Sequence, residues 1–341
     1  MPEKKITVIG LGGIGGTVAG FLADAGEKVT VVDKASAHIE TIRAKGLLVD
    51  GILGERRVKF DSVLLPEELK EPLDWVFLAV KSHHTEQALA PVIPLISEES
   101  IIISLQNGLN ERRIAKRIGA SRVIGAMIHM VGAYIEPGHV TRFKSGQFYL
   151  GELDGAETER VQKVAAVLSQ VVPTYITNNI WGYLWSKLIA TSFRVATALV
   201  DAPSEDILKP EWARRIFIGI MGEATEAAIA AGIRLEEYDG FNPLVTLTRN
   251  EEELAQALKM LPTGSGKGNS GSWRDIKIFR RKTECEFTTG EIVRIGQKHG
   301  LAMTMNSKVA EMIKEEEEGL RSMSWDNLRK LEKDAKDRLP T

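Results

Sequence analysis

The chain of 341 residues is 43% hydrophobic and 26% charged, which is the composition of an ordinary folded protein and excludes an intrinsically disordered one. A formal net charge of -2 argues against nucleic acid as a partner, and the single cysteine, Cys285, excludes internal disulfides and cysteine metal clusters. The length predicts two domains. Because no signal-type segment follows Met1 and no apolar run reaches the roughly 20 residues that span a bilayer, we expect a cytoplasmic protein without membrane contact.

The chain begins with the pattern of a strand, a helix and a second strand. Residues 6–9 and 29–32 are short apolar runs rich in β-branched residues, and residues 18–25 between them have the pattern of a helix. Their apolarity is continuous rather than alternating, which is typical of a parallel sheet covered by helices on both faces. Three further strands of this kind are expected at 75–80, 101–105 and 123–127.

The pattern changes in the middle of the chain. Residues 140–143 and 148–150 flank Lys144, Ser145 and Gly146, which predicts a hairpin at the edge of the sheet. After about residue 176 the strand patterns stop. Helical patterns then follow at 180–199, 211–231, 273–299 and 305–319. We therefore expect an α/β domain over residues 1–176 and an all-helical domain over residues 177–341.

Two segments of the second half stand apart from these helices. Residues 236–271 contain two prolines and a glycine–serine cluster at 264–268, which predicts a mobile loop around a short helix at 251–260. Glu315 to Glu318 form the main block of like charge in the chain, and a solvated helix face is its simplest interpretation.

A glycine motif of G-x-G-x-x-G spacing lies between the first strand and the first helix. Gly10 permits the tight turn, Gly12 leaves room for a pyrophosphate, and Gly15 lets the helix approach the strand closely. Gly13 and Ile14 complete the loop at the start of the helix, whose N-terminus would face the phosphates. The position of the motif in a βαβ unit predicts a dinucleotide site.

The second strand ends in Asp33, which is 23 residues after Gly10. A carboxylate at this place accepts hydrogen bonds from the ribose hydroxyls and repels a 2′-phosphate, so Asp33 favours NAD. The adjacent Lys34 is either a solvated side chain or a partner for the 2′-phosphate of NADP. The sequence therefore predicts NAD or NADP, with NAD slightly favoured.

Polar residues follow two more predicted strands. Lys81 comes after the strand at 75–80, and Asn107 after the strand at 101–105. Ligand crevices of open α/β sheets form at such strand ends, so both are candidates for cofactor or substrate contacts, although Asn107-Gly108 is also a common turn. His83 and His84 either touch a substrate or are solvated.

A lysine stands among large apolar residues in the first helix of the second domain. The segment reads Leu184-Trp185-Ser186-Lys187-Leu188. From this segment alone, a lysine that extends its ammonium to solvent is the simpler interpretation.

These residues, taken together and in this order, resemble the ketopantoate reductase family (2-dehydropantoate 2-reductases). The resemblance covers nearly the whole chain and implies a Rossmann fold, that is, a doubly wound parallel sheet, followed by an all-helical domain for substrate and dimerisation. It also implies reduction of a 2-oxo acid with NADPH in the cleft between the domains, in a homodimer. The matching residues are the glycine loop, Val80-Lys81, Gln106-Asn107-Gly108, His129, Pro137-Gly138, Leu184 to Leu188, Asp275-Ile276 and Thr283-Glu284.

The resemblance assigns roles to four residues. Lys187 resembles the catalytic lysine, which hydrogen-bonds the reacting oxygen, and Glu284 resembles its acidic partner. Asn107 corresponds to the asparagine near the nicotinamide, and Lys81 to the lysine beside the cofactor. This is chemically reasonable, because hydride attack on a carbonyl builds negative charge on oxygen that an ammonium stabilises.

The substrate side departs from the family pattern. Members that reduce ketopantoate usually carry asparagines where this chain has Thr191 and Val195, so the expected substrate wall is smaller and less polar. Arg194 lies near that face and either replaces a lost polar contact or is a surface residue. Members of the family bind the substrate carboxylate with a serine, and Ser270 and Ser272 are both candidates for that serine in this chain.

Arg274, close to these serines, is suited to grip a carboxylate with two hydrogen bonds. The leading hypothesis is an NAD(P)-dependent reductase or dehydrogenase of a small 2-oxo or 2-hydroxy acid, with no metal. A redox-neutral lyase or isomerase with retained NAD and a non-catalytic dinucleotide sensor are the alternatives. Lys187 and Glu284 argue against the sensor, which needs neither.

Overall fold

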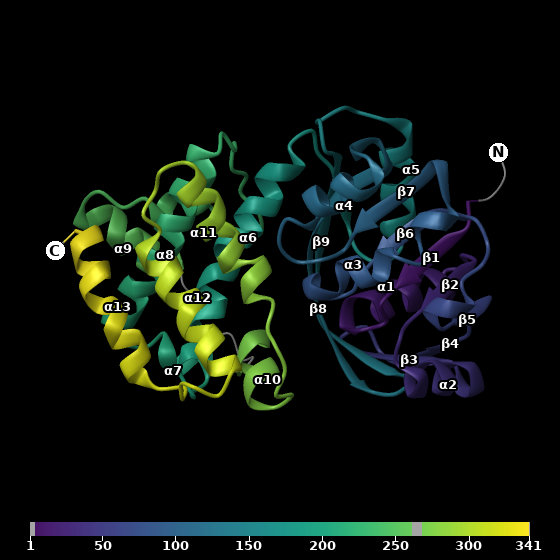
Figure 1. The fold of residues 1–341 in the computed structure, drawn as a ribbon, viewed down its shortest axis with the longest axis horizontal. Helices are drawn as coiled ribbons and strands as arrows, with labels where there is room; N and C mark the ends of the chain where they lie inside the picture. Colours follow the sequence, from purple (N-terminus) through teal and green to yellow (C-terminus); the bar gives the residue numbers. More distant parts are fainter. Residues whose placement is uncertain (1–3, 261–267, 341) are drawn as a thin grey trace. The chain divides into compact units, whose positions relative to one another are not determined.

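The computed structural model describes residues 4–260 and 268–340, and the chain divides into two compact units, Met1–Ile180 and Trp181–Thr341 (Figure 1). The first unit is built on one large sheet with helices, and the described part of the second contains helices and one isolated β-bridge. This confirms the predicted fold class. Within the described ranges, no helix is long and apolar enough to cross a membrane. Of the glycine–serine cluster at 264–268, residues 264–267 lie outside the described residues.

The described part of the first unit holds a ten-stranded sheet. Its strands are β1 (Ile6–Ile9), β2 (Val29–Val32), β3 (Leu47–Gly51), β4 (Arg56–Val58), β5 (Ser62–Leu64), β6 (Leu73–Leu78), β7 (Ile96–Ser104), β8 (Val123–Glu136), β9 (His139–Glu152) and β10 (Thr174–Ile176). The accompanying α-helices are α1 (Gly13–Asp24), α2 (Ser36–Lys45), α3 (Thr85–Leu89), α4 (Asn110–Ile118) and α5 (Glu159–Leu168).

Six strands form the parallel part of this sheet. They lie in the order β5-β2-β1-β6-β7-β8, and every neighbouring pair among them is parallel. In chain order the sheet grows from β1 first in one direction, through β2 and β5, and then in the other, through β6. The loops that leave β1 and β6 therefore diverge, and such a switch point is where open α/β sheets bind ligands.

The strands alternate their side chains between two hydrophobic cores. Val8 and Phe77 pack in one core with the apolar residues of α1, α2 and α5, whereas Ile9 and Leu78 pack in the other with those of α3 and α4. Helices thus cover both faces of the sheet, which explains why the strand sequences are continuously apolar.

The hairpin predicted around Lys144 to Gly146 is wrong, because β9 is one continuous strand in the interior of the sheet. It pairs antiparallel with β8 on one side, and on the other it pairs parallel with β3 and, further along, with β10. The turn lies instead at Pro137-Gly138. A Cβ on Gly146 would lie 1.5 Å from the carbonyl oxygen of His129, so this glycine marks a close backbone approach rather than a turn.

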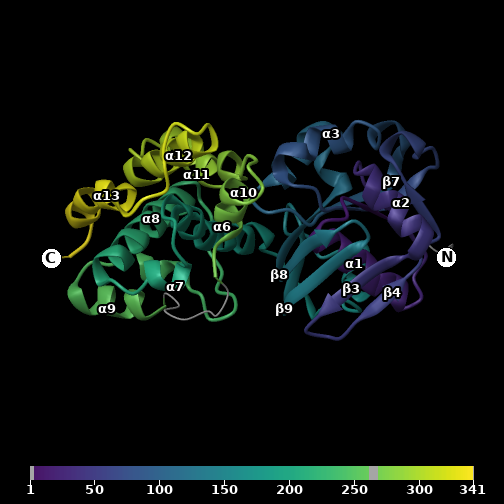
Figure 2. The same ribbon diagram turned by 90° about the horizontal axis from the view of Figure 1, so that it is seen from below.

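The second unit is organised around one long helix. Helix α8 packs against α11, α12 and α13, which lie beside it in both views (Figure 1, Figure 2). The buried Glu223 of α8 accepts hydrogen bonds from the backbone N–H groups of Met305 and Asn306, where a carboxylate favours the start of α12. The helices are α6 (Ile180–Ala196), α7 (Ser204–Ile207), α8 (Glu211–Ala230), α9 (Glu251–Met260), α10 (Gly271–Lys277), α11 (Thr289–Lys298), α12 (Thr304–Glu317) and α13 (Trp325–Arg338).

The single helix predicted over 273–299 is wrong. Two α-helices, α10 and α11, occupy this range, and the segment over 278–288 that joins them contains only a short 3-10 helix, Cys285–Phe287. Helix α10 ends at Lys277, the following Ile278 and Phe279 are 58% and 51% exposed, and Arg280 has a left-handed backbone with φ 47° that a continuing helix does not allow. Glu284 therefore lies on a connecting segment and not on a helix face.

Candidate active site

The glycine loop after β1 has the close approaches that its motif predicts. Gly10 has φ +93°, and a Cβ there would meet the backbone nitrogen of Val80 at 2.8 Å. A Cβ on Gly15 would lie 1.9 Å from the carbonyl oxygen of Gly10, so the helix packs directly on the turn. At Gly12, in contrast, no protein atom lies within 4 Å of an added Cβ. Gly12 is thus open to an approaching ligand.

A second set of glycines fits α1 against the later strands of the sheet. A Cβ on Gly13 would lie 2.3 Å from the carbonyl carbon of Gly132 in β8, and one on Gly16 would lie 2.9 Å from Val140 in β9. Gly20 approaches β3 in the same way. The structure therefore gives Gly13 a packing role that the sequence analysis did not predict. The signal for it was the i, i+3, i+7 spacing of Gly13, Gly16 and Gly20, which places all three on one face of α1. A cofactor contact of Gly13 stays a prediction.

Asp33 is fixed at the end of β2 by two backbone groups. Its carboxylate accepts hydrogen bonds from the N–H of Leu11 at 2.7 Å and from the N–H of Ala35 at 2.9 Å. One carboxylate thus joins the glycine loop to the start of α2. The neighbouring Lys34 is exposed, and its Nζ lies 3.2 Å from Nε2 of His84, so the two basic side chains lie together beside the loop after β6.

A buried histidine that the sequence reasoning missed supports the same loop. His38 of α2 accepts a hydrogen bond at Nδ1 from the N–H of Gly138, at 2.8 Å, and its Nε2 lies 3.1 Å from the carbonyl oxygen of Leu11. The first bond places the proton on Nε2, which then donates to Leu11. Burial lowers the pKa of His38 below its usual value, although Asp33 and the bond to Leu11 oppose this shift. His38 is therefore a neutral link between the glycine loop and the β8–β9 turn.

The loops after β6 and β7 are joined by a network of hydrogen bonds. Oγ of Ser82 donates to the carbonyl oxygen of Asn107 at 3.0 Å, and the amide of Asn110 donates to both Asn107 and Ser82, at 2.7 and 2.9 Å. The structure thus brings the loops of Lys81 and Asn107 together. The Lys81 side chain is half-buried and that of Asn107 is exposed.

In the second unit, Lys187 lies on a half-exposed stripe of α6. Tyr183, Lys187 and Thr191 follow each other at i, i+4 and i+8 and are half-buried, and Arg194 continues the stripe as an exposed residue. Oγ1 of Thr191 donates to the carbonyl oxygen of Lys187 at 2.8 Å, so this hydroxyl uses its proton within the helix. Val195 is only 3% exposed and belongs to the core.

The first part of the predicted loop over 236–271 makes hydrogen bonds with α6 and within itself. Oγ of Ser186 donates to the carbonyl oxygen of Glu236 at 2.6 Å, and the N–H of Glu236 donates back to Oγ at 3.2 Å. Tyr238 pairs with Phe241 through an isolated bridge. Burial raises the pKa of Tyr238 to about 12, although the charge of Arg194 opposes the shift. The helix predicted at 251–260 is confirmed as α9.

The remaining candidates lie on α10 and on the segment that follows it. Ser270 is the N-cap of α10, and its hydroxyl accepts from the N–H of Trp273 at 3.3 Å. Ser272 and Arg274 are half-buried on the helix. Glu284 is half-buried, and its carbonyl oxygen accepts from Oγ1 of Thr288 at 3.0 Å. That Glu284 meets Lys187, and that both meet the cofactor, stay predictions.

The prediction that Glu315 to Glu318 form a solvated helix face is wrong for most of these residues. Glu316 is only 5% exposed, and burial raises its pKa to about 8. Glu315 and Glu317 are half-buried, and only Glu318 is exposed. In residues 4–260 and 268–340, no group of three or more His, Cys, Asp or Glu side chains gathers as a metal site.

Two family models match the chain, one for each half. The model of the ketopantoate reductase PanE/ApbA matches residues 6–155, and that of its C-terminal domain matches residues 179–317. Together they cover more than half of the chain, and they include the glycine loop, Asn107, Lys187 and Glu284.

Known proteins agree with this match. A 2-dehydropantoate 2-reductase of Mesorhizobium japonicum is 31% identical over 256 residues, 67% of this chain and 77% of that protein. A D-mandelate dehydrogenase with bound NADH and anilino(oxo)acetate is similar with a TM-score of 0.80 and 22% identity, over 93% of this chain and 99% of that one. A dimeric ketopantoate reductase from Staphylococcus aureus is similar with a TM-score of 0.71 and 17% identity, over 93% of this chain and all of that one. The chain belongs to the ketopantoate reductase family.

Proposed function

We propose that this protein transfers hydride between a nicotinamide cofactor and a small 2-oxo or 2-hydroxy acid. The observation that carries the proposal is the half-exposed Lys187 on the otherwise largely buried α6, in a chain whose two halves both match the ketopantoate reductase family. The open approach to Gly12, at the switch point of the sheet, supports the nucleotide part of the proposal.

We assign the proton and charge chemistry to residues of both units. When bound, the nicotinamide supplies or accepts the hydride. The Lys187 ammonium donates a hydrogen bond to the substrate oxygen, where negative charge grows as the carbonyl is reduced. Glu284 keeps that lysine charged and oriented. Asn107 contributes near the nicotinamide and Lys81 beside the cofactor, and residues 1–176 and 177–341 act as the dinucleotide-binding and substrate domains.

We infer a substrate with a less polar side chain than that of ketopantoate. Because the Thr191 hydroxyl donates its proton to the backbone of its own helix, it has no donor left for a ligand and offers only an acceptor oxygen and a methyl group. Val195 is buried, so it supplies no polar contact. Ser270 or Ser272, together with Arg274, would bind the substrate carboxylate, and Arg194 is the further candidate beside Lys187.

Steady-state assays of nicotinamide absorbance test this function. We expect turnover with NADH and at least one acid from a panel of 2-dehydropantoate, aliphatic 2-oxo acids and phenylglyoxylate, and the reverse reaction with NAD and the 2-hydroxy acid. Failure of every acid to oxidise or reduce the cofactor would contradict the proposal. Product formation without net NADH would instead favour the redox-neutral alternative.

Asp33 is expected to select NADH over NADPH. Its carboxylate is held by Leu11 and Ala35, and it would repel a 2′-phosphate placed beside it. We expect Asp33→Asn to lower the ratio of kcat/KM for NADH to that for NADPH by about tenfold, or about 1.4 kcal/mol. A loss of loop stability affects both cofactors and cancels in this ratio.

The matched variant for this experiment is Lys34→Gln. If Lys34 binds the 2′-phosphate of NADP, this variant weakens NADPH alone. A wild-type preference for NADPH that Asp33→Asn leaves unchanged would show that Asp33 does not select the cofactor.

We further propose a homodimer, in line with the dimeric family member from Staphylococcus aureus that shares this fold. A small molecule is its proposed partner, and we place the protein in the cytoplasm. Sedimentation velocity at several protein concentrations tests the assembly, since a monomer at all of them would contradict it.

A further inference from the structure

The segment that carries Glu284 is anchored by a carboxylate from another helix. Thr283 is buried, at 4% exposure, and both its backbone N–H and its Oγ1 donate hydrogen bonds to Oε1 of Glu317, at 2.8 and 2.6 Å. The same Oγ1 accepts from the N–H of Cys285 at 3.0 Å. The residues on both sides of Glu284 are thus tied, through one hydroxyl, to a single carboxylate.

The position of Glu317 is unfavourable for a carboxylate except for these bonds. Glu317 is the last residue of α12, where the helix dipole is negative and disfavours a negative charge. Glu315, Glu316 and Glu318 add acidic neighbours in sequence. A carboxylate here therefore lowers the stability of α12, and its two hydrogen bonds from Thr283 offset this cost.

We propose that Glu317 is a positioning residue for Glu284, an inference that rests on the proposed function. Its two bonds fix the backbone of Thr283, and the bond between Thr283 and Cys285 extends this constraint across Glu284. Together they set the direction in which the Glu284 side chain leaves the backbone. Because the segment over 278–288 contains only a short 3-10 helix, Cys285–Phe287, this link adds rigidity that an α-helix would otherwise supply.

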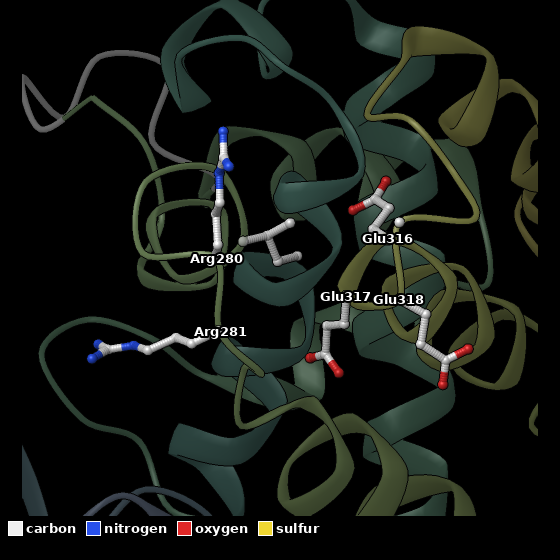
Figure 3. Close-up of a pocket in the computed structure, with 7 residues that line it drawn as sticks. Arg280, Arg281, Glu316, Glu317 and Glu318 are labelled. Carbon is white, nitrogen blue, oxygen red and sulfur yellow. The ribbon is translucent and has the colours of Figure 1, made fainter.

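Glu317 is also reachable from solvent. It lines a cavity of about 310 Å³ together with Glu316, Glu318, Arg280 and Arg281, and Figure 3 shows its side chain extending from the end of α12 toward the segment of the two arginines. Truncation of Glu317 therefore leaves a gap that opens to a space large enough for a small carboxylate such as formate.

The test compares Glu317→Ala and Glu317→Gln with the control Glu318→Ala, a change in the adjacent residue that lines the same cavity. In Glu317→Ala we expect hydrogen exchange of the amides of Thr283 and Cys285 to rise about tenfold or more. The amide of Thr283 loses its acceptor, and the Thr283 hydroxyl that accepts from Cys285 is no longer held by Glu317. With 2-dehydropantoate or another acid of the panel as substrate, kcat should fall about 100-fold while KM changes less than threefold, the cost of a misplaced catalytic group.

Two changes should restore kcat, namely the conservative substitution Glu317→Gln and the addition of formate to Glu317→Ala. Glu317→Gln keeps an amide oxygen that accepts both bonds, so it should retain kcat within about threefold. Formate added to Glu317→Ala should restore part of kcat and slow the exchange at Thr283, whereas it should leave Glu318→Ala unchanged. Equal melting temperatures in the Gln variant and wild type keep these comparisons valid even if the Ala variant folds poorly.

The proposal is overturned if Glu317→Ala and Glu318→Ala have the same kcat, or if kcat falls without faster exchange at Thr283 and Cys285. A full kcat in Glu284→Gln also overturns it, through the catalytic role of Glu284 rather than through Glu317. The exchange data need no substrate. They therefore report on the link from Thr283 to Glu317 even if no acid is turned over, an outcome that contradicts the proposed function itself.

Discussion

Replacement of Lys187 by methionine is expected to lower kcat by about 10²- to 10³-fold, the usual effect of removing one group that stabilises a developing oxyanion. Methionine keeps most of the length and the apolar stem of lysine, so α6 should retain its packing while the ammonium is lost. Nucleotide affinity should stay within about twofold, because the proposed nucleotide site lies in the first unit. Stopped-flow kinetics separate the hydride step from binding, and quenching of NADH fluorescence measures the affinity.

Two variants serve as controls for this experiment. Lys187→Arg keeps a positive charge but moves it and changes its shape, so it should recover only part of kcat. Lys209→Met removes an exposed lysine of the same unit, whose partner is Asp206, and should leave kcat unchanged. If Lys187→Met retained kcat within threefold of wild type, Lys187 would not be the catalytic lysine, and the sensor hypothesis would gain.

The strands near the glycine loop were predictable because each contains a short, continuously apolar run. The five predicted parallel strands correspond to β1, β2, β6, β7 and β8, and the helix pattern at 211–231 corresponds to α8. In these segments the local pattern and the tertiary structure agree, because strands that are buried on both faces have continuously apolar sequences.

Errors arose where a residue type has two structural meanings. Gly146 suggested a turn, but it permits a close approach to His129 inside a strand pair. The apolar residues Ile278 and Phe279 fall within the helix predicted over 273–299, but they are exposed and lie outside any helix. A single sequence cannot separate these meanings, because the neighbouring strand or helix that decides between them lies far along the chain.

The candidate site shows the same division. The positions of Gly10, Gly12 and Gly15 followed from one local motif, and the structure gives each the surroundings that the motif implies. His38 and Glu317 act through partners about 100 and 34 positions away, Gly138 and Thr283, and no local pattern marks such pairs. Residues that support a site from a distance are thus the ones that sequence reasoning misses.

Two alanine substitutions in the glycine loop are expected to have different effects, one on nucleotide affinity and the other on the stability of the free protein. Gly12 has φ -71° and ψ -165°, which alanine adopts readily, and an added Cβ meets no protein atom within 4 Å. Gly12→Ala should therefore keep the melting temperature of the free protein but lower nucleotide affinity about tenfold or more, because the methyl group occupies the approach of the pyrophosphate. Isothermal titration with NADH, together with thermal unfolding without ligand, measures both.

Gly15→Ala should instead destabilise the free protein. Its Cβ would lie 1.9 Å from the carbonyl oxygen of Gly10 and 2.8 Å from Cβ of Ala79, so α1 must move away from the turn. Such overpacking costs about 1–3 kcal/mol, which lowers the melting temperature of a unit of this size by about 3–10 °C. Equal melting temperatures for Gly15→Ala and wild type would show that the loop yields easily. Unchanged NADH affinity in Gly12→Ala would show that the nucleotide does not approach the loop at Gly12, whatever Lys187 does in the second unit.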